Sequence, residues 1–243
     1  MVAVLKGAKN RFLALLLGFL SLLFFIFALR YFLAVGLHEY VDNRIQQWSL
    51  SAVPSQKQIN LQNQYLQLAE TFAWQDSYQR LITGAKLYQW QALLQQNSPQ
   101  ISPDSVAASL QQAKVRYQQA ATLMPETFAA WYELSIVKAN LQEFDAQFAL
   151  ALQAVDALKG VNSALYWQKV SGVLPYWQAL SFSQKTQLLK DIAWLLQTQF
   201  VQQSQLLALI KNSAAQPVFC QYVKSTELSQ NQRIMQTLQC PIK

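Results

Sequence analysis

Residues 12–29 read FLALLLGFLSLLFFIFAL, an uninterrupted apolar run of eighteen residues near the amino terminus. The run resumes after Arg30 with residues 31–37, YFLAVGL. About 20 apolar residues in a helix cross the ~30 Å hydrocarbon core of a bilayer. Residues 12–37 therefore predict a transmembrane helix, with Arg30 near its far end, where the side chain can extend towards the headgroups beside Tyr31.

Basic residues in front of this run predict its orientation. Lys6, Lys9 and Arg11 lie in a tail, residues 1–11, that we expect to be cytoplasmic because positive flanking charge is retained there. The alternative is a cleaved signal peptide, but its apolar region is normally only about 7–15 residues, and residues 34–36 (AVG) make a poor cleavage site. The length of the apolar run favours an uncleaved signal anchor over a cleaved signal peptide. With either alternative, the rest of the chain is expected in the periplasm of a bacterium. The uncleaved anchor would lie in the inner membrane.

Composition predicts an all-α fold for the exported part. Hydrophobic residues make up 52% of the chain and charged residues 13%, and outside the apolar run Gln, Leu and Ala dominate. These residues favour helices whose exposed faces carry amides. Six glycines and seven prolines are too few for the tight turns of an all-β protein.

The net charge of +7 does not point to a nucleic-acid partner. Residues 1–44 carry five basic and two acidic residues, which accounts for much of the excess, and the other basic residues are scattered. A phosphate backbone requires a stripe of Lys and Arg on one face, and no such stripe appears. We expect no nucleic-acid binding.

The pattern beyond the span predicts a linker, a helical domain and a tail. Residues 38–57 form a polar connector that ends near Pro54, the helical domain covers 58–216, and the tail covers 217–243 and looks mostly irregular. Asp76 or Ser77 is a plausible N-cap, and Pro175 is expected to kink or end a helix. Apolar spacing and breakers place helices at about 59–72, 77–93, 104–123, 163–178, 182–199 and 201–211.

Part of this domain has the residue pattern of tetratricopeptide repeats. Small residues let two helices approach, an aromatic fills the gap and proline stops the second helix. The matching residues are Ala113, Tyr117, Ala120 and Pro125, then Trp131, Leu134 and Ser135, then Phe144, Ala151 and Ala154. Gln147 and Lys159 stand where Ala and Pro are usual. The prediction is therefore a degenerate tetratricopeptide-like stack of helical hairpins behind a transmembrane helix.

The tail contains both cysteines of the chain, Cys220 and Cys240. An oxidising compartment would allow them to pair, and closing a loop of about 20 residues would contribute roughly 3 kcal/mol. The alternative is two buried free thiols. The predicted periplasmic location favours the disulfide.

Two blocks of sequence, together with the anchor, resemble one family. The first block is residues 78–81 (YQRL) followed by residues 85–92 (AKLYQWQA). The second contains Pro125, Trp131, Leu134, Lys138, Phe144, Asp145 and Phe148. In these residues the chain is similar to the VpsP family of polysaccharide-biosynthesis proteins. The resemblance implies an inner-membrane accessory protein with a tetratricopeptide-like periplasmic domain that serves an exopolysaccharide assembly system, and it transfers no catalytic residues.

The residues that could carry chemistry do not form a catalytic motif. His38, the single histidine, lies beside Glu39 and is interpreted as a polar residue at the membrane boundary, with no partner for a triad or zinc motif. Glu143 with Asp145, and Glu70 with Asp76, are the only carboxylate clusters. Carboxylates two apart on a helix point away from each other, and Asp145 is better placed near a helix start, where a carboxylate is favourable. We expect no enzyme activity, cofactor or metal.

Aromatic side chains are the remaining candidates for contact with a partner or a glycan. Trp90 and Trp131 fall on core positions of their helices. The candidate contact residues are Tyr132, Trp167, Tyr176 and Trp177, although core packing is the alternative for each.

Three functions follow as hypotheses. The first is a scaffold that binds another envelope protein of a polysaccharide system through protein–protein contacts. The second is a module that binds the polysaccharide itself through aromatic residues and amides. The third is a scaffold for another envelope process, such as secretion or cell division.

Overall fold

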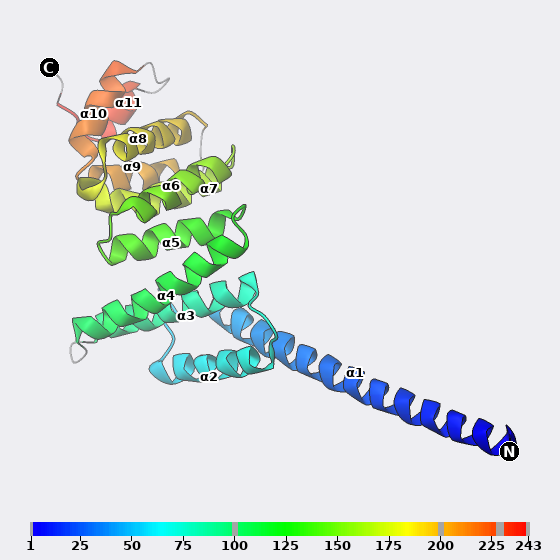
Figure 1. Cartoon of the computed structure of the whole chain (residues 1–243). Helices are drawn as coiled ribbons and strands as arrows, with labels where there is room; N and C mark the ends of the chain where they lie inside the picture. Colours follow the sequence, from blue (N-terminus) through cyan, green and yellow to red (C-terminus); the bar gives the residue numbers. More distant parts are fainter. Residues whose placement is uncertain (1, 99–101, 199–201, 227–230, 242–243) are drawn as a thin grey trace. The chain divides into compact units, whose positions relative to one another are not determined.

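The computed structural model describes residues 2–98, 102–198, 202–226 and 231–241, with side chains described from residue 15 onward except at 231. This part of the chain is helical and contains no strand (Figure 1). The predicted all-α class is confirmed. The elements are α1 (Val2–Gln46), α2 (Gln56–Phe72), α3 (Tyr78–Gln96), α4 (Pro103–Leu123), α5 (Phe128–Asn140), α6 (Ala146–Leu158), α7 (Ser163–Val173), the 3-10 helix η1 (Leu174–Ala179), α8 (Phe182–Gln197), α9 (Gln203–Lys211), α10 (Gln216–Ser225) and α11 (Asn231–Thr237).

The chain divides into two compact units, Met1–Arg116 and Tyr117–Lys243. The helical domain expected over 58–216 is shared between these two units. The division falls within α4, so the first unit begins with the apolar helix and the second consists of α5 to α11 with the end of α4.

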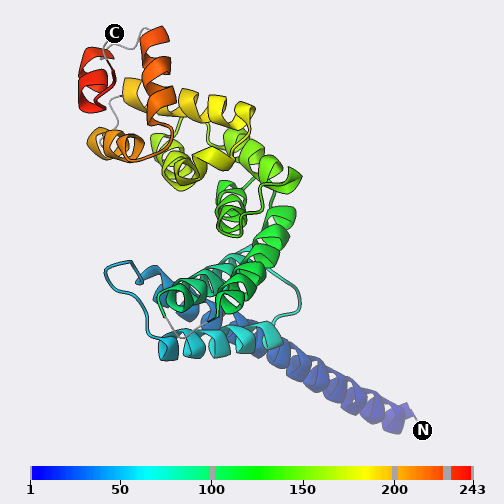
Figure 2. The same cartoon turned by 90° about the vertical axis from the view of Figure 1, so that its left-hand side faces the viewer.

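Helix α1 contains the predicted membrane span. From Leu15 to Gln46 it is long and apolar enough to cross a membrane, and among the described residues it alone meets that test. Its side chains between Leu15 and Phe32 are mostly exposed, as a lipid-facing surface requires. Both views show the amino-terminal part of α1 extending away from α2 and α3 (Figures 1 and 2).

The expected linker over 38–57 is wrong for its first part, because α1 continues without a break to Gln46. Ala34, His38, Val41 and Ile45 are buried, and their spacing of three and four residues places them on one face of the helix. This face packs against α2 and α3. The core there contains Val41, Ile45, Ile59, Leu66 and Leu87, with Trp48 and Trp90 packed against it.

Side-chain caps define several helix starts. Ser77 caps α3 by accepting a hydrogen bond from the Arg80 amide, and Asp145 caps α6 by accepting one from the Phe148 amide. The sequence predicted Asp76 or Ser77 as the first cap and placed Asp145 near the start of a helix. Each cap satisfies a backbone N–H that has no partner within its helix, which stabilises the helix by ~1 kcal/mol.

The second unit has helices stacked on their chain neighbours. Helix α5 packs against α6 and α7, and α7 packs against α8 (Figure 1). Most small and aromatic positions of the predicted repeat pattern are buried, including Tyr117, Ala120 and Ala151, whereas Trp131, Phe144 and Ala154 are half-buried. Helix α7 ends at Val173, and Pro175 lies in the 3-10 turn that follows, as its missing N–H and fixed φ favour.

The tail expected to be irregular over 217–243 is instead largely helical. Pro217, the first residue of that expected tail, lies in the first turn of α10, where proline is favourable. Phe219 and Val223, four residues apart, are fully buried and bring α10 onto the core of the second unit. Helix α11 follows and packs against α10.

Candidate functional site

His38, interpreted from the sequence as a polar residue at the membrane boundary, lies inside the first unit. The side chain is buried, with its Nε2 atom 3.1 Å from the Thr83 hydroxyl oxygen. Thr83, itself buried, donates its hydroxyl proton to an Asp42 carboxylate oxygen at 2.9 Å. Since a hydroxyl has one proton, the imidazole must donate from Nε2. The three groups join α1 to α3.

The direction of these hydrogen bonds argues against an activated nucleophile. A catalytic hydroxyl gives its proton to the histidine, whereas the proton of Thr83 is directed at Asp42. The hydroxyl is also almost inaccessible, because Thr83 is 1% exposed. This His–Thr–Asp chain therefore acts as a structural connection between helices.

The carboxylates of Glu143 and Asp145 converge on one buried lysine. The Lys138 ammonium donates to Glu143 at 2.9 Å, to Asp145 at 2.9 Å and to the Gln147 amide oxygen at 3.2 Å, so each of its three protons has an acceptor. Burial opposes the charge, but hydrogen bonds to the two carboxylates outweigh it and raise the pKa of Lys138. These carboxylates lie in the α5–α6 turn, so the expectation that they point apart on a helix is wrong.

The other carboxylate cluster is not one site. Glu70 forms an ion pair with Arg116 at 2.6 Å, and the Arg116 guanidinium also lies 5.6 Å from the centre of the Tyr88 ring. Asp76 is exposed in the α2–α3 turn. Gly84 makes room for the arginine, since a Cβ there would lie 2.7 Å from its guanidinium nitrogen.

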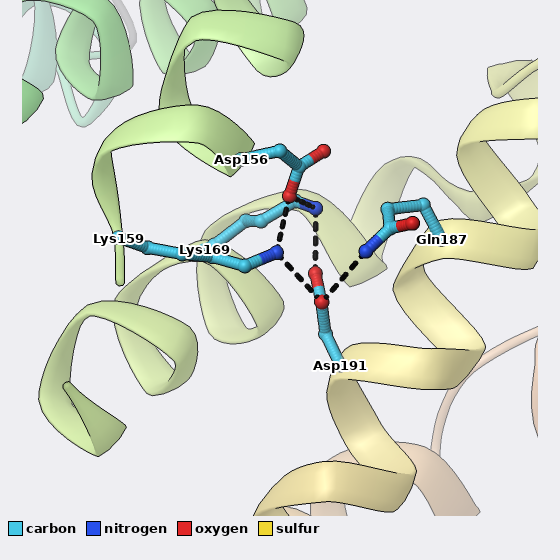
Figure 3. Close-up of polar contacts among 5 residues, drawn as sticks. All are labelled: Asp156, Lys159, Lys169, Gln187 and Asp191. Carbon is cyan, nitrogen blue, oxygen red and sulfur yellow. Dashed lines mark hydrogen bonds and ion pairs between the residues drawn. The ribbon is translucent and has the colours of Figure 1, made fainter. Parts of the chain in front are cut away.

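A second buried ionic cluster lies between α6, α7 and α8 (Figure 3). The Asp191 carboxylate accepts hydrogen bonds from Lys159 at 2.7 Å and Lys169 at 2.6 Å, and from the Gln187 amide at 3.1 Å. Both lysines also donate to Asp156. Two cations thus face two anions, which is the balance that burial of charge requires.

The ammonium group of Lys159 is held in place by several partners. Burial disfavours the charge of Lys159, but its bonds to Asp156 and Asp191 outweigh burial and raise its pKa. Its ammonium also lies 4.5 Å from the centre of the Tyr166 ring, which stacks on Trp194 at 4.1 Å. A lysine with this many partners is unsuited to act as a general base or nucleophile, so the cluster is structural.

Two of the predicted contact residues, Tyr132 and Tyr176, lie together on the second unit. Tyr132 on α5 is half-buried and stacks on Phe128 with ring centres 5.7 Å apart. Burial raises the pKa of Tyr132 to about 12, with Glu133 and Tyr176 adding to the shift. Gly172 allows the Tyr132 side chain to lie against α7, because a Cβ at residue 172 would lie 2.7 Å from the Tyr132 hydroxyl.

Tyr176, in the 3-10 helix η1, lies near Tyr132. It is half-buried, burial raises its pKa, and its hydroxyl donates to the Asn140 side chain. Its ring lies 6.1 Å from that of Phe144. We call Phe128, Tyr132, Asn140 and Tyr176 the aromatic surface. Phe128 was missed in the sequence, although its four-residue spacing from Tyr132 places both on one helix face.

The two tryptophans among the candidate contact residues expose less ring surface to a partner than the two tyrosines do. Trp177 is 5% exposed and belongs to the core, so its ring has almost no surface for a ligand. Trp167 is half-buried and packs against the same core. Trp131, expected to pack between helices, is half-buried, and its indole N–H donates to the Pro125 carbonyl at 2.8 Å.

Cys220 and Cys240 form a disulfide in the structure. It connects α10 to the segment after α11 and closes a loop with a sequence separation of 20. Both residues are buried. Within the described residues, no three His, Cys, Asp or Glu side chains come together as a metal-binding group.

Comparisons with protein-family models, curated proteins and solved structures find no match to this chain. The functional argument therefore depends on its own residues. The aromatic surface is the best candidate for partner contact in the second unit. The apolar half of α1 is the best candidate for contact with a membrane.

Proposed function

We propose that this protein is a non-catalytic scaffold, anchored by α1 in a bacterial inner membrane, whose two helical units lie in the periplasm and serve exopolysaccharide biosynthesis or export. The span lies within residues 12–37, with residues 1–11 in the cytoplasm. The partner is another envelope protein of the same system, and the aromatic surface is its contact.

One observation carries the anchoring part of the proposal. Helix α1 is mostly exposed and mostly apolar from Leu15 to Phe32, and its continuation supplies Val41 and Ile45 to a buried core. A cleaved signal sequence is not expected to continue directly into the core of the mature protein. The continuity of α1 thus favours an uncleaved anchor that holds the first unit close to the membrane.

The pathway is supported by the resemblance of residues 78–92 and of the Pro125–Phe148 region to the VpsP family. Deleting the gene is expected to abolish or shorten the exopolysaccharide while division and secretion proceed normally. Loss of division or secretion with normal polymer would instead support a scaffold for another envelope process.

The scaffold and its contact surface are tested together by crosslinking in cells. A photoreactive amino acid at exposed Asn140 should capture a specific envelope protein, identified by mass spectrometry. The matched control is the same probe at Phe182, which is 86% exposed in the same unit but lies outside the aromatic surface. Equal capture at both positions would contradict a partner site on this surface.

Polysaccharide binding is the second candidate function, and the aromatic surface is the observation in its favour. Half-buried tyrosine rings beside an exposed amide are suited to stack on sugar rings and donate hydrogen bonds. Titration calorimetry with the cognate polymer would then show saturable binding that Tyr176→Ala weakens and Phe182→Ala does not. Absence of binding to the wild-type protein would leave the protein scaffold as the function.

A further inference from the structure

The length of the apolar run fixes where α1 leaves the membrane. A helix rises 1.5 Å per residue, so about 20 residues from Phe12 cross a ~30 Å core and reach the far interface near Tyr31. Tyr31 is 71% exposed, as expected for an aromatic residue in a headgroup layer. Helix α1 then continues as a helix to Gln46 above this level.

The turn between α2 and α3 packs on α1 at this same level. The Trp74 ring lies 4.7 Å from the Phe27 ring, centre to centre. The Arg30 guanidinium lies 5.5 Å from the centre of the same indole and donates to the Thr71 carbonyl at 3.2 Å. Phe27 and Arg30 belong to the last turns of the span, so the turn that carries Trp74 lies at the membrane boundary.

Trp74 remains 66% exposed in spite of these contacts. An indole has an apolar body and one N–H donor, which suits it to the interface between hydrocarbon and water. The ring that it contacts, Phe27, is itself 46% exposed and belongs to the apolar part of α1 that we propose above to contact lipid. The medium that covers the rest of the Trp74 ring is therefore the same bilayer.

A groove of about 470 Å³ lies beside Trp74, between α1 and the α2–α3 turn. Its lining includes Tyr31, Val35, Asp76 and Arg80, so it presents aromatic and apolar surface together with charges of both signs. This mixture matches the headgroup layer of a phospholipid bilayer, where ammonium and phosphate groups meet the first methylenes.

We infer that the α2–α3 turn, residues 73–77, is a second membrane contact, with Trp74 inserted in the headgroup layer of the outer leaflet. This inference rests on the proposed membrane span. The contact fixes the orientation of the first unit relative to the bilayer, because α1 and the turn meet the membrane at two points.

The test is fluorescence quenching of the full chain reconstituted in vesicles of phosphatidylethanolamine and phosphatidylglycerol. Lipids brominated near the headgroup should quench part of the tryptophan emission, and Trp74→Phe should lose that quenched component. The matched control is Trp48→Phe, which alters the other end of the same unit and should retain it. Equal quenching of Trp74→Phe and wild type would overturn the inference.

A second measurement separates failure of this contact from failure of the span. Both native cysteines are in a disulfide, so one introduced cysteine is the only thiol available for a nitroxide label. Labels are placed at Leu22, in the span, at Gln75, beside Trp74, and at Leu50, which is 81% exposed in the same unit. The label at Gln75 should be several-fold less accessible to a water-soluble nickel complex than the label at Leu50.

The outcomes are distinct. A lipid-buried label at Leu22 with equal nickel access at Gln75 and Leu50 overturns the membrane contact and leaves the span intact. A water-accessible label at Leu22 overturns the span and, with it, this contact.

Discussion

Replacing Asp191 with alanine removes the carboxylate that both buried lysines share. Asp191 is 1% exposed and accepts hydrogen bonds from Lys159 and Lys169, which are 4% and 2% exposed. In the variant two buried ammonium groups face the single carboxylate of Asp156. Removing one partner from a buried ion pair costs about 3–5 kcal/mol, because the charge left behind has lost both its partner and its water.

That loss is large against the total stability of a small protein, about 5–15 kcal/mol. Urea unfolding of the full chain in mild detergent, followed by circular dichroism, measures it. The control is Lys190→Ala, the exposed neighbour on the same helix, which should change stability by no more than ~0.5 kcal/mol. An Asp191→Ala midpoint equal to that of Lys190→Ala would refute the reasoning.

A double replacement tests whether charge imbalance is the cause. Lys169→Met with Asp191→Leu removes one cation and one anion together and leaves Lys159 paired with Asp156. Replacing a buried ion pair by apolar side chains of similar size is often neutral or stabilising. The double variant should therefore be more stable than Asp191→Ala. If it is less stable, loss of packing, and not an unpaired charge, dominates.

Three further predictions concern other parts of the fold. Ile45→Asp should destabilise the first unit by at least ~3 kcal/mol, because the position is 4% exposed and contributes to its core, and a wild-type urea midpoint would contradict this. Cys220→Ser with Cys240→Ser should lower stability by about 3 kcal/mol through the lost loop constraint, visible as a lower Tm; an unchanged Tm would show that the disulfide contributes nothing. Burial raises the pKa of Tyr132 to about 12 from 10.0, so the unfolded chain releases this proton at lower pH than the folded chain, and folding stability should fall between pH 10 and 12. Tyr132→Phe should flatten that fall. Identical dependence of stability on alkaline pH in the variant and the wild type would contradict the shift.

Local signals in the sequence predicted much of the fold. The apolar run predicted the candidate span, Ser77 and Asp145 were recognised as helix starts, and Pro175 marked the end of α7. Each depends on residues close together in the chain. Two errors had local causes as well. The buried stripe that includes Val41 was hidden among polar residues, and the tail from Pro217 was expected to be irregular although Pro217 lies in the first turn of a helix.

The polar clusters could not be predicted because their members are distant in sequence. Asp191 lies 32 residues from Lys159 and 22 from Lys169, and only the packing of α6, α7 and α8 brings them together. The same holds for His38, whose partner Thr83 is 45 residues away. Of the candidate site, Tyr132 and Tyr176 were proposed from their residue type alone, whereas burial of Trp177 depended on tertiary packing.

Topology is the claim on which anchoring, partner and membrane contact all depend. A reporter enzyme that is active only outside the cytoplasm, fused after Lys243, measures it directly in a bacterial host. We predict an active fusion at normal expression, with activity falling when Lys6, Lys9 and Arg11 are replaced by Gln and the orientation signal is lost. An inactive reporter on a stable, full-length fusion would contradict the account.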